Sequence, residues 1–166
     1  MATLPPFAYW VDPDKVLAGR YPTSAADIVT LLTCDVTCFL DLTTGVEDLA
    51  PYEPHLQPAA THLGLPPNRI EYHRLSIADL GAPSRQGMIE ILDLLDCKVA
   101  QGHRVYLHCH YGRGRTGTVV GCYLVRHGMT GADALRAIRL RRRHLDGPSP
   151  ESAAQERLVR EWRSGE

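Results

Sequence analysis

The chain has 166 residues, of which 44% are hydrophobic and 22% charged, and its formal net charge is −1. This length suits one domain with one substantial core, and the apolar content argues against a disordered chain. No segment reaches the roughly 18 uninterrupted apolar residues of a membrane span, so we expect no stable membrane association, and we expect no nucleic-acid partner.

The N-terminus and the cysteines together predict the compartment. Residues 1–6 lack the charged region and the apolar core of a secretion signal. The chain has five cysteines, an odd number without paired spacing, which fits a reducing compartment. We therefore expect a cytoplasmic protein, and we expect it to be a monomer.

Strands and helices alternate along the first hundred residues. We expect short strands at 9–11 and 16–18, a helix at 25–33 that Ser24 caps, a buried strand at 36–42 and another strand at 69–75. Five prolines between positions 51 and 67 are expected to break the intervening region into short helical and loop pieces. An amphipathic helix is predicted at 84–100, and its apolar face consists of Met88, Ile91, Leu92, Leu95 and Val99.

The second half of the chain continues the alternation. A strand at 105–108 leads through a loop into a buried helix that Gly128 stops, and a basic helix from about residue 131 and a last helix at 150–162, for which Ser149 is a suitable N-cap, complete the chain. Strands separated by helices imply a mostly parallel sheet flanked by helices, with a ligand loop at the carboxyl end of a strand. We therefore predict a single α/β domain over residues 1–166.

Charge is distributed unequally. Residues 1–100 hold six Lys and Arg against thirteen Asp and Glu, whereas residues 101–166 hold twelve against six. One helix is expected to carry a basic stripe formed by Arg136, Arg139, Arg141, Arg142 and Arg143. We interpret the stripe as a solvated face; the alternative is that it lines a cleft and steers anionic substrates.

The loop between residues 108 and 117 carries the chemistry. Cys109 stands at the end of a short apolar strand, and Arg115 follows six positions later in the same loop. The unpaired N–H groups at the start of the next helix point back at this loop and make an anion cradle. A thiol that faces these N–H groups and a guanidinium favours its thiolate form, which is the nucleophile.

This Cys-x5-Arg spacing, with His108 before it and Thr116 after it, resembles the signature loop of the cysteine-dependent protein tyrosine phosphatase superfamily. The resemblance implies that Cys109 attacks phosphorus, that Arg115 grips two phosphoryl oxygens, and that Thr116 donates to the thiolate. It also implies that the phosphate is held by the loop residues His110, Tyr111, Gly112, Arg113 and Gly114, together with Arg115.

A second loop supplies a candidate acid. Ester cleavage needs a proton donor on the side of phosphorus opposite the nucleophile, and a separate loop must provide it. Asp79, followed by a Gly-Ala-Pro-Ser run and placed about thirty residues before Cys109, resembles the general-acid loop of the small dual-specificity phosphatases. Residues 149–155 are similar to the segment that opens the final helix in that family, which makes Gln155 a candidate for positioning water.

Several other interpretations compete. An inert core cysteine would need no Gly-x-Gly-Arg loop behind it, and the GxGxxG pattern at 112–117 lacks the second strand of a dinucleotide site. Zinc is rejected because strand alternation separates His108 and His110 from Cys109 and because Arg113 and Arg115 repel cations. We thus expect no metal and no cofactor. A rhodanese-like sulfurtransferase and a non-catalytic phosphate-binding module remain as remoter alternatives.

Substrate choice stays open at the sequence level. His110 and Arg113 place two potentially basic residues beside the phosphate, a pattern similar to the loops of phosphoinositide and inositol-polyphosphate phosphatases. No basic membrane-docking segment accompanies the loop. We therefore expect a phosphorylated protein as substrate, with a phosphorylated inositol as the alternative.

Overall fold

The computed structural model describes residues 4–166. The expectation that residues 1–6 are not a secretion signal therefore falls partly outside the described residues, since positions 1–3 are not among them. One sheet forms the centre, with strand order β1-β2-β5-β3-β4. Its strands are β1 (Ala8–Asp12), β2 (Val16–Gly19), β3 (Val36–Asp41), β4 (Glu71–Arg74) and β5 (Arg104–His108). β2, β5, β3 and β4 run parallel, and β1 pairs antiparallel with β2. The predicted mostly parallel sheet is confirmed.

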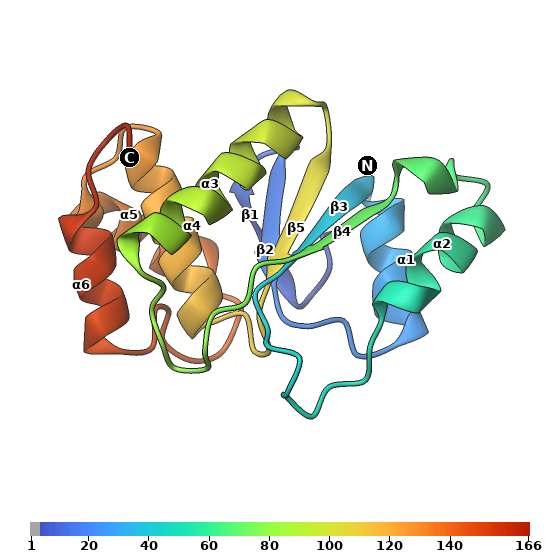
Figure 1. The fold of residues 1–166 in the computed structure, drawn as a ribbon, viewed down its shortest axis with the longest axis horizontal. Helices are drawn as coiled ribbons and strands as arrows, with labels where there is room; N and C mark the ends of the chain where they lie inside the picture. The colour runs from blue at the N-terminus through green and yellow to red at the C-terminus, as the bar shows by residue number, and fades with distance from the viewer. Residues whose placement is uncertain (1–3) are drawn as a thin grey trace.

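Helices cover both faces of this sheet (Figure 1). They are α1 (Ala25–Thr33), α2 (Glu53–His62), the 3-10 helix η1 (Pro67–Arg69), α3 (Arg85–Ala100), α4 (Gly114–Arg126), α5 (Gly131–Arg141) and α6 (Ala153–Glu161). α1 and α2 lie on one side and α3 to α6 on the other. Each side has its own apolar cluster, so the sheet is buried on both faces, as parallel sheets require. None of these helices is both long and apolar enough to span a bilayer, considering positions 4–166.

β5 is the central strand, since it pairs with β2 on one side and β3 on the other. Its side chains alternate between the two apolar clusters: Val105 and Leu107 join the α3–α6 side, and Tyr106 joins the α1–α2 side. Continuing that alternation, Cys109 belongs to the α3–α6 cluster. The carboxyl ends of the four parallel strands meet at one edge, where the segments after β3, β4 and β5 come together.

The proline-rich region consists of short helical and loop pieces, as expected: the ten-residue helix α2, with Pro54 in its first turn and Pro58 inside it, and the three-residue helix η1. One sequence-based expectation about the helices was wrong. The N-cap of α6 is Ser152, not Ser149: Ser152 and Gln155 form a capping box. The Ser149 hydroxyl instead donates to the carbonyl of Arg113 at 2.8 Å, which ties the segment before α6 to the predicted phosphate loop.

The basic stripe holds only in part. α5 ends at Arg141, so the next two arginines lie beyond it. Arg136 and Arg139 are exposed and pair with Asp133 and Glu156. Arg142, however, is 4% exposed and donates to the carbonyls of Gly147 and Asp146. The solvated-face interpretation therefore fails for Arg142, because its guanidinium closes the loop that follows α5.

Candidate active site

The predicted phosphate loop connects the carboxyl end of β5 with the first turn of α4. Cys109 is buried, and its Sγ accepts a hydrogen bond from Thr116 Oγ1 at 3.0 Å. No hydrogen bond among positions 4–166 uses the backbone N–H groups of residues 110–113. Gly112 has φ +68°, and a Cβ there would lie 2.4 Å from the carbonyl of Gly19. The loop therefore needs glycine at this position both for its conformation and for its close approach to the chain after β2.

Arg115 is the centre of the site's charge network. Its guanidinium is 2% exposed and donates to both carboxylate oxygens of Glu47, at 2.6 and 3.1 Å. It also donates to the carbonyl of Ile77 at 3.2 Å, and its Nη2 lies 3.1 Å from Asp79 Oδ1. The hydrogen bonds from Arg115 hold the pKa of Glu47 down at about 2. Fixed in this way, the guanidinium is preorganised for binding oxygen anions.

Glu47 is a site residue that the sequence analysis missed. It lies in the loop between β3 and α2, and the backbone N–H of Thr44 donates to its Oε1 at 2.8 Å. The available signal was topological: an acidic residue that follows a buried strand lies at the same sheet edge as the phosphate loop when the strands are parallel. Nothing in the local sequence distinguishes it from Asp48.

Asp79 reaches the site from the segment between β4 and α3. Ala78 to Gly81 form a turn closed by a hydrogen bond from Gly81 N–H to the carbonyl of Ala78, at 2.9 Å. The Asp79 side chain is largely exposed, and its Oδ1 contacts Arg115 and also accepts the Leu80 N–H. The structure thus brings the predicted acid, from the segment between β4 and α3, to Arg115, which shares the phosphate loop with Cys109.

Gln155 holds the turn that carries Asp79. The side chain is fully buried, and its Nε2 donates to the carbonyl of Gly81 at 2.9 Å. Its Oε1 accepts the N–H groups of Glu151 and Ser152. The amide therefore links α6 to the acid loop, and a role in positioning water stays a prediction.

His108 supports the loop from the opposite face of the sheet. Its ring contacts Tyr52 Oη at 2.6 Å through Nε2 and the carbonyl of Cys109 at 3.2 Å through Nδ1. Burial lowers the pKa of His108, although Asp41 opposes this effect. A neutral ring that carries its proton on Nδ1 satisfies both contacts. His108 thus fixes the backbone at Cys109 without facing the thiol.

The mouth of the site carries aromatic and basic side chains. The Tyr111 ring stacks on His110, with centroids 4.1 Å apart and planes 12° from parallel. The Arg113 guanidinium lies 5.7 Å from the centroid of the Tyr111 ring. Within positions 4–166, Arg113 forms no ion pair with a carboxylate. Its guanidinium instead lies against Gly147, where a Cβ would be 2.7 Å away.

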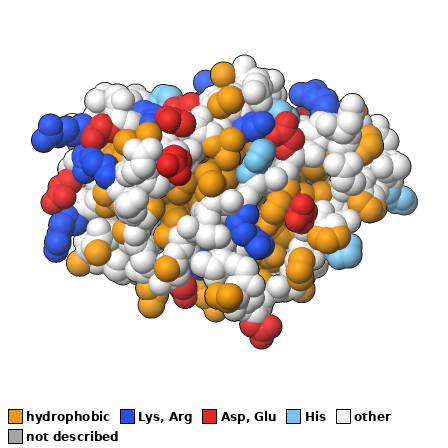
Figure 2. Space-filling model, viewed as in Figure 1, with side chains coloured by type: hydrophobic (Ala, Val, Ile, Leu, Met, Phe, Trp, Pro, Cys, Tyr) orange, Lys and Arg blue, Asp and Glu red, His pale blue; other side chains and the backbone are white. Residues whose placement is uncertain are grey.

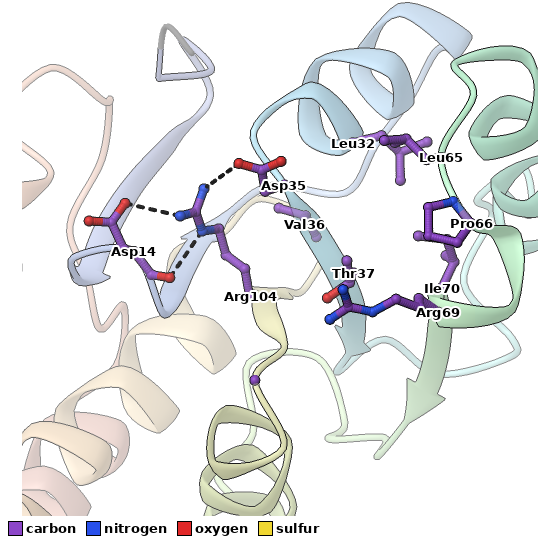
Figure 3. A pocket seen from close by; sticks show the side chains of 11 residues that line it. Asp14, Leu32, Asp35, Val36, Thr37, Leu65, Pro66, Arg69, Ile70 and Arg104 are labelled. Atoms are coloured by element: carbon purple, nitrogen blue, oxygen red, sulfur yellow. Dashed lines mark hydrogen bonds and ion pairs between the residues drawn. The ribbon is translucent and has the colours of Figure 1, made fainter. Parts of the chain in front are cut away.

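Two other features lie away from this loop. Cys38, Glu71 and His73 on β3 and β4 have ligand atoms close enough to share a metal ion, but Lys98 Nζ lies 2.6 Å from the Glu71 carboxylate and neutralises it. A cavity of about 320 Å³ opens at the other end of the sheet (Figure 3). There Asp14 and Asp35 hold Arg104, and Leu32, Val36 and Ile70 supply an apolar lining. Neither feature includes a residue of the phosphate loop.

Comparison with known proteins finds one matching family model and several curated relatives. A family model described as Swiss Army Knife protein, DSP-PTPase phosphatase domain (PTP-SAK) matches residues 5–165. The chain is 37% identical over 72 residues to dual specificity protein phosphatase CDC14B of Mus musculus, a match that covers 43% of this chain and 14% of the relative. It is 30% identical over 152 residues to phosphatidylglycerophosphate phosphatase PTPMT2 of Arabidopsis thaliana, covering 90% of this chain and 63% of the relative.

Solved structures support the fold. The crystal structure of Tk-PTP in its active form superimposes with a TM-score of 0.78 at 24% identity, covering 95% of this chain and 96% of the other. The chain thus spans less than two thirds of the curated relatives named above, but nearly all of a solved structure with the same fold.

Proposed function

The chain belongs to the DSP-PTPase phosphatase domain family, and from this membership we propose that it hydrolyses phosphate monoesters through a cysteinyl-phosphate intermediate. The observation that carries the proposal is the meeting of three groups at one point. Cys109 Sγ lies in the phosphate loop beside Thr116, Arg115 lies in the first turn of α4, and the Asp79 carboxylate lies 3.1 Å from the Arg115 guanidinium. Nucleophile, anion receptor and proton donor are thus present together.

The proposed reaction has two steps. Arg115 and the loop N–H groups bind the phosphoryl oxygens, Cys109 Sγ forms a bond to phosphorus, and the ester oxygen leaves with a proton from Asp79. Water then attacks phosphorus and gives its proton to the Asp79 carboxylate, and the sulfur–phosphorus bond breaks to release inorganic phosphate. The Thr116 hydroxyl, which donates to Sγ in the structure, stabilises the thiolate as it leaves.

For the substrate we propose a phosphorylated protein first. The family includes relatives named as a protein phosphatase and as a phosphatidylglycerophosphate phosphatase, so membership alone favours neither. A specific observation keeps phosphorylated inositols as the second candidate: Arg113, in the phosphate loop, forms no ion pair with a carboxylate within positions 4–166 and is available to a second phosphate.

A panel of substrates tests both levels. Phosphotyrosine, phosphoserine and phosphothreonine peptides, phosphoinositides and soluble inositol phosphates are compared by phosphate release at equal concentration. Release from none of them, with thiosulfate turnover instead, would support a rhodanese-like sulfurtransferase. Tight phosphate binding without turnover would support a non-catalytic phosphate-binding module. The presence of Asp79 at Arg115 favours catalysis, because neither alternative needs an acid.

The cytoplasmic location and the monomeric state are part of this proposal. The location rests on the sequence, through an odd number of cysteines without paired spacing. Cell fractionation and the mass measured by light scattering test them independently of activity.

A further inference from the structure

A second group of chemically reactive side chains lies at the amino ends of the parallel strands, away from the phosphate loop. Cys38 on β3 and Glu71 on β4 are paired neighbours, His73 follows two positions along β4, and His103 directly precedes β5. We call these four residues the strand-edge cluster. In Figure 2, histidine, basic and acidic side chains adjoin one another where Figure 1 shows the end of α3 and the start of β4.

Glu71 is the meeting point of the strand-edge cluster. His73 Nε2 lies 2.9 Å from one carboxylate oxygen of Glu71, and His103 Nε2 lies 3.3 Å from the other. The ligand atoms of Cys38, Glu71 and His73 all lie within 4.8 Å of one another. In a tetrahedral zinc site, neighbouring ligand atoms are about 3.2–3.8 Å apart, because each is bonded to the metal at roughly 2.0–2.3 Å. The observed separations therefore approach those around a single zinc ion.

An ion pair at Glu71 does not account for the whole cluster. Lys98 Nζ, from the last turn of α3, lies 2.6 Å from the carboxylate and neutralises it without any other residue. The Cys38 side chain is 1% exposed, and within positions 4–166 no hydrogen bond uses its sulfur. A buried thiol without a partner and two imidazoles directed at one carboxylate are surplus to an ion pair. They are the ligand types that zinc prefers.

The orientation of the His103 ring also suits metal binding. Its Nδ1 lies 3.0 Å from Thr37 Oγ1, and its side chain is largely buried. When Nδ1 carries the proton and donates to that hydroxyl, the lone pair remains on Nε2, the nitrogen that faces Glu71. A hydrogen bond from the other ring nitrogen is the usual support of a metal-bound histidine.

Lys98 is the competitor of a metal ion at Glu71. Its Nζ also donates to Gln101 Oε1 at 3.2 Å, so the ammonium keeps a partner on α3 when another cation takes the carboxylate. Repulsion between the ammonium and a divalent ion weakens metal binding. Lys98 is therefore expected to lower the affinity of the cluster for a metal ion without blocking any of the four ligand atoms.

We propose that Cys38, Glu71, His73 and His103 form a zinc site that joins β3, β4 and the start of β5. On binding, the thiol releases its proton to solvent, the Lys98 ammonium leaves the carboxylate, and zinc takes four ligand atoms. β4 pairs only with β3, so the site ties this edge strand to the centre of the sheet. The inference is independent of the proposed phosphatase function, because no ligand belongs to the phosphate loop or to the acid turn.

This proposal departs from the sequence-based expectation of no metal, which weighed zinc only at the histidines beside Cys109. The members of the strand-edge cluster span positions 38 to 103, and no short motif spacing connects them. Only the pairing of β3 with β4, and of β3 with β5, brings them together.

The test uses Co²⁺ as a spectroscopic substitute for Zn²⁺, on protein first dialysed against a chelator. Tetrahedral cobalt bound by a thiolate gives visible d–d bands and a near-ultraviolet charge-transfer band, and equimolar Zn²⁺ should remove both. Cys38→Ser should lose the charge-transfer band and bind Zn²⁺ roughly 100-fold more weakly, measured by competition with a chromophoric chelator. Zn²⁺ should raise the thermal midpoint of wild type but not of Cys38→Ser.

A second variant changes the affinity in the opposite direction. Lys98→Gln removes the competing ammonium and should bind Zn²⁺ about 10-fold more tightly than wild type. It replaces no buried residue, so it tests the site even if Cys38→Ser fails to fold. Cys97→Ser, at an exposed cysteine on α3, and Cys109→Ser, in the phosphate loop, are the matched thiol controls, and both should keep the charge-transfer band.

Three results would overturn the zinc site. A charge-transfer band that persists in folded Cys38→Ser, or that disappears in Cys109→Ser, would place the metal at another thiol. An unchanged Zn²⁺ affinity in Lys98→Gln would mean that the metal does not bind at Glu71. Wild-type protein that takes up neither Co²⁺ nor Zn²⁺ would leave the cluster as an ion pair beside a buried thiol.

Discussion

The two sides of the candidate active site differ in charge and in origin. On one side, the acidic wall consists of Val46, Glu47, Asp48, Asp79 and Leu80. On the other side, the basic wall consists of Arg113, Arg142 and Arg143, the latter two lining a cavity of about 240 Å³ beside Gly147. Both Arg113 and Arg142 contact Gly147, one by packing and one by a hydrogen bond to its carbonyl.

This difference has the same direction as the unequal charge of the two halves of the chain. The acidic wall comes from the first hundred residues and the basic wall from the remainder. The opposite charges of the two halves nearly cancel in the net charge of −1.

On the acidic wall, Glu47 is bound by Arg115, and the proposed acid Asp79 also lies against Arg115. On the basic wall, Arg113 and Arg143 form no ion pair with a carboxylate within positions 4–166, whereas Arg142 is buried and donates to the carbonyls of Gly147 and Asp146. Under the proposed function, the acidic wall would supply the acid for the leaving group, and Arg113 would be available to a further anionic group of the substrate.

The largest effect should come from replacing Cys109, the proposed nucleophile, on which turnover of every substrate depends. Cys109→Ser should reduce turnover on the order of 10⁴-fold or more for every substrate, while phosphate binding persists because the loop N–H groups and Arg115 remain. Turnover and isothermal titration with inorganic phosphate measure the two properties. Cys97→Ser, at an exposed cysteine on α3, should leave turnover unchanged. Full activity in Cys109→Ser, or loss of wild-type activity on chelation with recovery on metal addition, would contradict covalent catalysis.

The next effect separates the leaving groups on the acidic wall. Asp79→Asn should lower kcat on alkyl phosphates by about 10²–10⁴-fold and much less on nitrophenyl phosphate, whose leaving group needs little protonation. Steady-state kinetics on the two esters measure the contrast. Asp48→Asn is the control, because it removes a carboxylate from the same wall without removing the acid. Equal losses on both esters in Asp79→Asn would identify Asp79 as a structural residue.

On the basic wall, Arg113→Ala should lower kcat/KM for a multiply phosphorylated inositol roughly 10- to 150-fold more than for a singly phosphorylated peptide. This factor corresponds to the loss of one charge-assisted contact of about 1.5–3 kcal/mol. The difference should shrink as salt is raised, because Arg113 is partly exposed. Parallel kinetics at low and high ionic strength measure both. Arg136→Ala, a solvated arginine on α5, serves as control. A loss shared by both substrates would make Arg113 a general part of the phosphate loop.

The parts of the fold that the sequence predicted are those with local signals. The helix at 25–33 with its Ser24 cap has the predicted bounds, because the capping hydrogen bond to Asp27 is formed within one turn. β5 and α4 were recognisable from uninterrupted apolar runs. The α6 cap also has a local signal, since Ser152 followed three residues later by Gln155 is a capping-box pattern; Ser149 lacks that glutamine at the third position after it.

The parts that sequence reasoning missed depend on long-range contacts or on an exception to residue preference. Glu47 and Arg115 are 68 positions apart, and no periodicity connects a loop carboxylate with a guanidinium in another loop. The positive φ of Leu80, 58°, was invisible because leucine gives no signal for such a conformation. The burial of Arg142 was missed because a run of arginines indicates solvent exposure unless a neighbouring loop offers carbonyl partners.

The smallest effect concerns the stability of the acidic wall. Glu47 has its pKa lowered from 4.5 to about 2, chiefly by hydrogen bonds from Arg115. A lowered pKa means that the ionised form stabilises the folded protein above pH 4.5 and that this contribution is lost as the pH falls toward 2. Glu47→Gln should therefore be less stable than wild type by about 1–2 kcal/mol at pH 7, measured by urea unfolding.

The pH dependence distinguishes this ion pair from a packing effect. The stability difference between wild type and Glu47→Gln should be constant from pH 7 to 5 and should fall by roughly half by pH 3, since Glu47 then becomes protonated mainly in the unfolded chain. Glu53→Gln, at the exposed start of α2, should show no such dependence. A difference that stays constant down to pH 3 would show that Glu47 acts through its shape and not through its charge, and Arg115 would then owe its fixed orientation to Ile77 and Asp79 instead.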